Sequence, residues 1–176
     1  DSSLTSSVYD FSPTELIAAA VKMNQGVDYR GSNLFSPTHL CIGASIDLGR
    51  KFEQETRLVH RKIKAGAKFF LLQTLFEPNK LKNFLLRYAD RYIEKPTTPI
   101  FCGVQILTEN SPVFSTIPNW VAQDLSKGRS GEDIACQLIS NFIELGFNSI
   151  YLVPPVWRGG SRDYEAAQRV MEAFNQ

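Results

Sequence analysis

Four short apolar runs that lack any hydrophobic–polar alternation constrain the fold of this chain most strongly. We interpret them as β-strands over residues 39–46, 68–76, 99–107 and 149–153. Continuous apolar strands of this kind are typical of parallel sheets that helices cover. The sequence therefore predicts an α/β fold whose four strands are parallel neighbours in chain order and curve as part of a barrel wall.

Helical patterns lie before, between and after these strands. The first helix begins at Pro13, where Ser12 and Glu15 complete a capping box, and it runs to about Asn24. Stripes of residues at helical spacing predict four more helices: Phe52, Thr56, Val59 and Ile63; Leu81, Phe84, Leu85, Tyr88 and Tyr92; Ile134, Leu138, Phe142 and Leu145; and Tyr164, Ala167, Met171 and Phe174. A short extra helix is expected near Trp120. Gly66 and Gly146 follow two helix ends, and Ser161 is the expected cap of the last helix.

The length of 176 residues suits one domain, which we place over residues 1–176. Four strands do not close a (β/α)₈ barrel, which needs eight strands and about 250 residues. An open four-stranded sheet leaves two edges unpaired. The chain is therefore either a small doubly wound domain or part of something larger.

Composition narrows the range of partners. The formal net charge is +1, so no basic field favours nucleic acid. Apolar runs are too short to cross a bilayer, and we expect no membrane partner. The scattered thiols of Cys41, Cys102 and Cys136 suit a reducing cytoplasm and most simply act as small buried hydrophobic groups. With His39 and His60 they form no metal-binding pattern.

Ligands of parallel α/β folds bind at the carboxyl ends of the strands. Ser45, Asp47 and Gln73 lie at such ends. The Gln73 amide can offer a donor and an acceptor to a planar heterocycle, or it can bond neighbouring backbone as a structural residue. Asp47 is either a ligand contact or a loop residue that starts the following helix.

Cationic residues offer two further candidate sites. Lys62 either favours the end of its helix as a cation or contacts a phosphate, and Glu55 lies on the same helical face seven residues earlier. The loop Arg158–Arg162 precedes the last helix and is either an anion site or a plain basic loop.

These residues form a pattern that resembles the flavin-dependent methylenetetrahydrofolate reductases. The pattern reads Glu55-x-x-Leu58-x-x-x-Lys62-x-x-Ala65-Gly66-Ala67-x-Phe69-x-x-x-Gln73. Further matches are Val8-Tyr9-Asp10, Gly43-Ala44, Ile117-Pro118-Asn119-Trp120, and the stretch from Gly131 through Ile134-Ala135 to Gly146. The resemblance implies a TIM barrel of which this chain supplies roughly strands five to eight.

The resemblance also implies ligands and residue roles. The flavin-side positions are Tyr9, Ser45, Asp47, Glu55, Arg61 and Lys62, which would hold FAD, while Gln73 and Arg158 would contact a folate-like pterin. The family activity is reduction of a methylene-folate to a methyl-folate, with NAD(P)H or another electron donor. The family's catalytic glutamate would lie before Asp1, so no catalytic residue is assigned here. The family's strand-seven sequence is replaced by Cys102-Gly103-Val104-Gln105-Ile106, and Arg158 stands two residues beyond the family's folate-side arginine position.

Three functions remain open on the sequence. The first is the FAD-dependent reductase. The second is a non-catalytic or partial subunit that needs a separate N-terminal half or forms an oligomer. The third is an unrelated phosphate-binding βα-barrel enzyme that uses the loop Arg158–Arg162.

Overall fold

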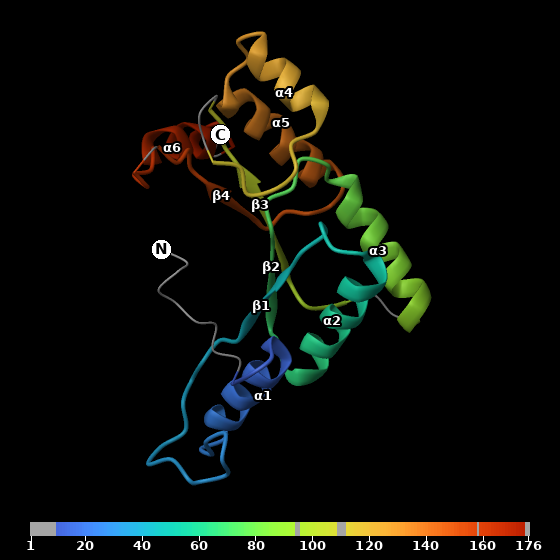
Figure 1. Ribbon diagram of the computed structural model, residues 1–176, viewed down its shortest axis with the longest axis vertical. Helices are drawn as coiled ribbons and strands as arrows, with labels where there is room; N and C mark the ends of the chain where they lie inside the picture. Colours follow the sequence, from blue (N-terminus) through green and yellow to red (C-terminus); the bar gives the residue numbers. More distant parts are fainter. Residues whose placement is uncertain (1–9, 94–95, 109–111, 158, 175–176) are drawn as a thin grey trace.

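The predicted parallel sheet with strands in chain order is confirmed (Figure 1). The strands of this computed structural model are β1 (Gly43–Ile46), β2 (Phe69–Leu72), β3 (Ile100–Gln105) and β4 (Ile150–Val153). Ser45 of β1 lies beside Leu71 of β2, which lies beside Phe101 of β3. The structure describes residues 10–93, 96–108, 112–157 and 159–174, and over these it is an α/β fold with a four-stranded parallel sheet.

Helices alternate with these strands in the predicted order. They are α1 (Pro13–Asn24), α2 (Phe52–Ala65), α3 (Asn79–Tyr92), α4 (Asn119–Ser126), α5 (Gly131–Glu144) and α6 (Tyr164–Glu172). The Ser12 capping box at α1 is present in full, since Glu15 N–H donates to Ser12 Oγ and Ser12 N–H donates to Glu15 Oε2. Gly66 and Gly146 follow α2 and α5 with φ of 111° and 87°. Both glycines stand where the sequence predicts helix ends.

The predicted cap of the last helix is wrong. Asp163, not Ser161, caps α6, and its Oδ1 accepts a hydrogen bond from Ala166 N–H at 3.0 Å. Ser161 still belongs to a preceding turn, where its carbonyl accepts from Trp157 N–H at 2.9 Å. The chain therefore enters the helix two residues later than expected.

Each strand is shorter than its apolar run. The run that begins at His39 joins the sheet only at Gly43, because the side chain of Asn24 binds the main chain of Leu40 on both sides. Asn24 Oδ1 accepts from Leu40 N–H, and Asn24 Nδ2 donates to the Leu40 carbonyl. The main-chain N–H and carbonyl of Leu40 thus find their hydrogen-bond partners on α1 and need none on a neighbouring strand.

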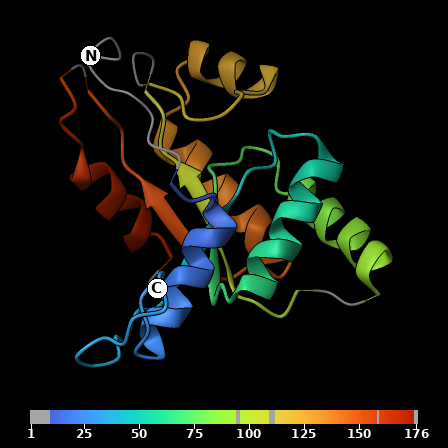
Figure 2. The ribbon, with the colours of Figure 1, turned by 60° about the horizontal axis from the view of Figure 1, so that its bottom comes forward.

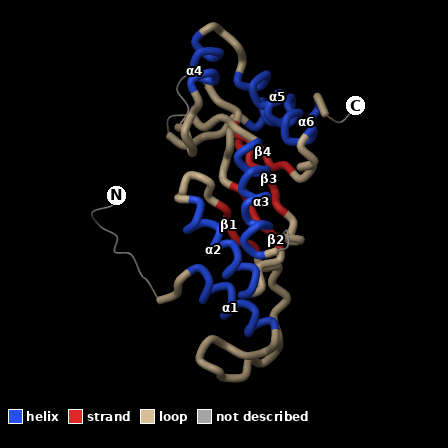
Figure 3. The backbone as a smooth tube through the Cα atoms, turned by 90° about the vertical axis from the view of Figure 1, so that its right-hand side faces the viewer, coloured by secondary structure: helices blue, strands red, loops and turns tan. Residues whose placement is uncertain are grey.

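The hydrophobic core lies between the sheet and the helices. Alternate strand residues such as Ile46, Phe70 and Val104 are fully buried, and they belong to one cluster with Val59 of α2 and Leu138 of α5. Figure 3 shows α2 and α3 in front of the strands, which agrees with their place beside the sheet in Figure 1. Figure 2 shows α1 (blue) alongside α2. Helices thus cover one face of the sheet.

The opposite face of the sheet is partly open. Leu71 and Phe101 are neighbours on this face and remain 44% and 36% exposed. Tyr151 of β4 covers Gly103 of β3, and its hydroxyl donates to the Leu72 carbonyl at 2.8 Å. A Cβ at Gly103 would lie 2.6 Å from that hydroxyl, so only glycine leaves room for the tyrosine. Within the described residues, β1 and β4 each pair on one side only.

Candidate functional site

A cavity of about 200 Å³ lies at the carboxyl ends of β1 and β2, where α/β folds bind ligands. Its walls are residues 47–49 after β1, residues 73–77 after β2, Lys80 of α3, and residues 114–116 of the loop after β3. The cavity thus brings together Asp47 and Gln73, two residues that the sequence predicts for ligand binding. Ser45 lies on β1 just before this cavity and is not part of its wall.

Gln73 presents a free amide to this cavity. The side chain is exposed and makes no hydrogen bond to the described part of the chain, while its main-chain N–H donates to the Ile46 carbonyl at 3.0 Å. The Gln73 amide is therefore not bonded to neighbouring backbone, as the structural alternative would require. Gln73 retains both a donor and an acceptor for a ligand.

Asp47 both lines the cavity and closes the turn into α2. Its Oδ1 accepts from Gly49 N–H at 2.9 Å, and its Oδ2 accepts from Arg50 Nε at 3.2 Å. The two interpretations of Asp47, a cavity residue and a loop residue before the helix, are thus compatible. Its carboxylate is held in one orientation at the cavity edge.

Gln105 has a structural role that the sequence does not reveal. This side chain is 1% exposed at the end of β3. Its Nε2 donates to the Pro112 carbonyl at 2.7 Å, and its Oε1 accepts from Phe114 N–H at 3.2 Å. Because Phe114 begins one wall of the cavity, Gln105 positions that wall. An amide at the end of an apolar strand is the only sequence signal for it, and it is the same signal that marks Gln73.

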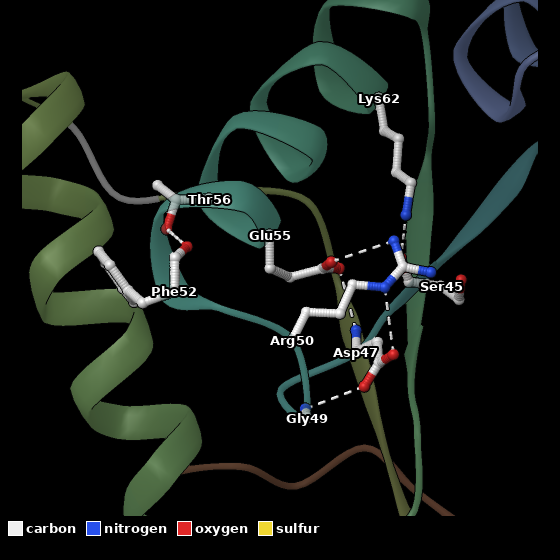
Figure 4. Close-up of polar contacts among 8 residues, drawn as sticks. All are labelled: Ser45, Asp47, Gly49, Arg50, Phe52, Glu55, Thr56 and Lys62. Atoms are coloured by element: carbon white, nitrogen blue, oxygen red, sulfur yellow. Dashed lines mark hydrogen bonds and ion pairs between the residues drawn. The ribbon is translucent and has the colours of Figure 1, made fainter.

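Glu55 and Lys62 lie on the same face of α2, as their spacing predicts, and both contact β1 or the turn after it (Figure 4). The ammonium of Lys62 donates to the Ser45 carbonyl at 2.5 Å, and the side chain is 5% exposed. Glu55 Oε1 accepts from Asp47 N–H at 3.0 Å. Glu55 Oε2 lies 3.6 Å from the Arg50 guanidinium and accepts no hydrogen bond from the described residues. Together these contacts fix the turn at one edge of the cavity.

Burial lowers the pKa of Lys62, and the carboxylate of Glu55 acts in the opposite direction. Removing an ammonium from water disfavours its charged form, whereas a nearby negative charge favours it. The net direction shows that the loss of water outweighs the attraction to Glu55. Lys62 is thus a buried cation whose hydrogen bond already has an acceptor in this chain.

Of the remaining predicted site residues the structure describes Arg61, which does not line the cavity. Arg61 is exposed and lines a different surface of α2 with Lys51, Glu53 and Arg57. Tyr9 and Arg158 lie outside the described residues. None of the helices in the described part of the chain is long and apolar enough to cross a membrane.

The fold and the cavity define an α/β protein with a cavity of about 200 Å³ at the carboxyl ends of its parallel strands. No protein-family model and no curated protein sequence matches this chain. In structure it is similar to an uncharacterized protein from Clostridium thermocellum that binds two copies of 5-methyl-5,6,7,8-tetrahydrofolic acid, with a TM-score of 0.58 and 18% sequence identity. The match covers 77% of this chain and 53% of that protein, so this chain spans about half of its neighbour's length. At this identity the similarity shows a shared fold.

Proposed function

We propose that this chain binds a folate-like pterin in the cavity between Asp47 and Gln73. The observation that carries the proposal is the unbonded amide of Gln73 on a cavity at the strand ends. A pterin edge presents donors and acceptors in one plane, which an amide can meet with one of each. The folate bound by the structural neighbour supports the same ligand class.

The size of the cavity fits the ring system of such a ligand. At about 200 Å³ it is below the range of about 300–1,000 Å³ that is usual for whole small-molecule sites. It suits a fused bicyclic ring, with the rest of the ligand outside. A complete FAD molecule would need further surface from elsewhere.

The reductase activity is the finer part of the proposal and rests on the resemblance to the methylenetetrahydrofolate reductases. In that proposal, residues 1–176 form one domain, the C-terminal half of a (β/α)₈ barrel in the cytoplasm, with NAD(P)H or another donor supplying electrons. FAD would carry the hydride chemistry when bound. Glu55 and Lys62 would support the flavin by fixing the turn that holds Asp47 (Figure 4), and Tyr9, Ser45 and Arg61 would be further flavin-side contacts. The catalytic acid would come from the other half of the barrel.

A second candidate is a folate-binding subunit without reductase activity. The structural neighbour binds 5-methyl-5,6,7,8-tetrahydrofolic acid, and this supports folate binding. In this case the chain would bind methyl-folate in the same cavity. It would bind no flavin and would not reduce the folate.

Calorimetric titration of the full chain with 5-methyltetrahydrofolate tests the binding proposal. We expect Gln73→Leu to weaken binding about tenfold, which is the loss of roughly 1–1.5 kcal/mol from hydrogen bonding. Gln123→Leu is the matched control, because Gln123 is an exposed amide on α4 outside the cavity. Equal affinities for wild type and Gln73→Leu would contradict the proposed site. Flavin absorbance and folate reduction, measured with the other half of the barrel supplied in trans, then separate the reductase from the binding subunit.

The half-barrel part of the proposal has its own test at the open face of the sheet. If a missing half covers this face, the chain alone should self-associate, because Leu71 and Phe101 are exposed neighbours there. Leu71→Asp should reduce this association in sedimentation velocity, whereas Leu86→Asp on the exposed side of α3 should not. A wild-type chain that is monomeric at all concentrations would contradict the half barrel.

A further inference from the structure

The cavity wall that comes from the loop after β3 is held by side chains. Residues 114–116 line the cavity, yet no main-chain group of residues 113–117 bonds to the main chain of another described residue. Gln105, the last residue of β3, and Thr74, just after β2, tie this segment to the sheet instead. The position of the wall therefore depends on these two side chains.

Gln105 binds the loop on both sides of Val113. Its Nε2 donates to the Pro112 carbonyl at 2.7 Å, and its Oε1 accepts from Phe114 N–H at 3.2 Å. The side chain is 1% exposed, so a lost partner could not be replaced readily by water. Gln105 does not itself line the cavity. Its role is to fix the main chain that leads into the wall.

The next residue along the wall is Ser115, and its hydroxyl faces that of Thr74. The two oxygens lie 3.4 Å apart, whereas hydrogen bonds between hydroxyls usually measure about 2.5–3.0 Å. Thr74 is buried, Ser115 is half-buried, and both line the cavity. A hydroxyl can donate once and accept twice. Their weak mutual contact thus leaves both groups with hydrogen-bonding capacity for a ligand.

We propose that the hydroxyls of Thr74 and Ser115 bind the ligand of this cavity, and that Gln105 is the positioning residue that holds Ser115 beside Thr74. This inference rests on the proposed function. It adds a second group of polar contacts to the Gln73 amide, since a planar heterocycle with several donors and acceptors can meet more than one side chain. Gln105 acts on the ligand only through the segment that it holds.

The hydroxyl contacts are tested by calorimetric titration of the full chain with 5-methyltetrahydrofolate. We expect Ser115→Ala and Thr74→Val each to weaken binding about three- to tenfold, which corresponds to the loss of one hydrogen bond. Valine keeps the branched shape of the buried threonine. Ser36→Ala is the matched control, because Ser36 is exposed in the loop before β1 and does not line the cavity. It should leave the affinity unchanged.

The positioning role of Gln105 is tested by a double-mutant cycle. Gln105→Met keeps the length of the side chain and removes both hydrogen bonds to the loop. We expect it to weaken binding about tenfold in wild type but to cause little further loss in Ser115→Ala, because the hydroxyl that it positions is already absent. Val113→Gly loosens the same loop from its exposed side and should show the same coupling, so the test holds even if Gln105→Met does not fold.

The outcomes separate this proposal from the one on which it rests. If Gln73→Leu weakens binding while either Ser115→Ala or Thr74→Val does not, the hydroxyl contacts are overturned and the pterin site stands. If Gln105→Met, or Val113→Gly in its place, causes the same loss with and without the Ser115 hydroxyl, the positioning role is overturned. A wild type that does not bind the folate overturns the pterin site, and this inference falls with it.

Discussion

Lys62 donates a hydrogen bond from its ammonium to the main-chain carbonyl of Ser45, at 2.5 Å, and thereby joins α2 to β1. Seven residues earlier on the same helix, Glu55 joins α2 to the turn that follows β1 by accepting from Asp47 N–H. The two contacts hold the strand and the turn from one helix. Asp47 is in this way fixed at the cavity that we assign to the pterin.

Replacing Lys62 should lower the stability of the fold. In Lys62→Met the Ser45 carbonyl loses its donor, and we expect the free energy of unfolding to fall by about 1–2 kcal/mol. Arg61→Met is the control, because this neighbour is exposed and should change the value by less than about 0.5 kcal/mol. Urea unfolding followed by circular dichroism measures both. FAD titration of the folded Lys62→Met variant tests the proposed support of the flavin, which predicts weaker FAD binding.

The same lysine should make stability depend on alkaline pH. Burial lowers the pKa of Lys62 from its ordinary value of 10.5. Between the lowered pKa and 10.5 the folded protein binds fewer protons than the unfolded chain, so the free energy of unfolding contributed by this group rises with pH. Lys62→Met lacks that contribution. Urea unfolding at about pH 8 and about pH 10 should therefore show wild type gaining stability relative to the variant. A constant difference would mean that the pKa is not lowered.

Gly131, the first residue of α5, should not tolerate a side chain. A Cβ there would lie 1.7 Å from the carbonyl oxygen of Leu107, which is main chain and cannot rotate away. We expect Gly131→Ala to cost about 1–3 kcal/mol or more, as overpacking does elsewhere. Asn119→Ala is the matched change, because Asn119 is exposed at the first position of α4. Equal melting temperatures for the two variants would show that the segments can separate freely.

The three thiols should differ in reactivity. Burial raises the pKa of Cys102 to about 12, and burial together with nearby Asp133 and Glu132 raises the pKa of Cys136. Both groups therefore remain protonated near pH 8, and a protonated thiol is a poor nucleophile. Cys41 is exposed, so it should react first with a thiol-specific reagent in the native protein, and all three should react in urea. Fast modification of Cys102 without denaturant would contradict the burial of β3.

The order of the elements is predictable from sequence because it depends on local patterns. Apolar runs and helical stripes determine which segments are strands and helices, and the short connections make neighbours in the chain neighbours in the sheet. The strand limits are not predictable in the same way. The start of β1 depends on the Asn24 side chain, which binds Leu40 across a loop.

The candidate site, too, is predictable from the sequence only in part. Gln73 and Gln105 both end apolar strands, yet one amide is free and the other is buried against Pro112 and Phe114. Only the path of the loop after β3 distinguishes them, and no local pattern encodes that path. The shared face of Glu55 and Lys62 follows from helical spacing, but the partners of that face depend on how α2 packs against β1.

Each strand after β1 pairs with the strand that precedes it in the chain. As the chain leaves the ribosome, every new strand can therefore dock on an edge that has already formed, without waiting for distant residues. The step from β3 to β4 is the longest, because both α4 and α5 stand between these strands. Closing a longer segment costs more entropy, so we expect β4 to dock last and slowest. The edge of β3 is then the edge that stays unpaired longest during synthesis.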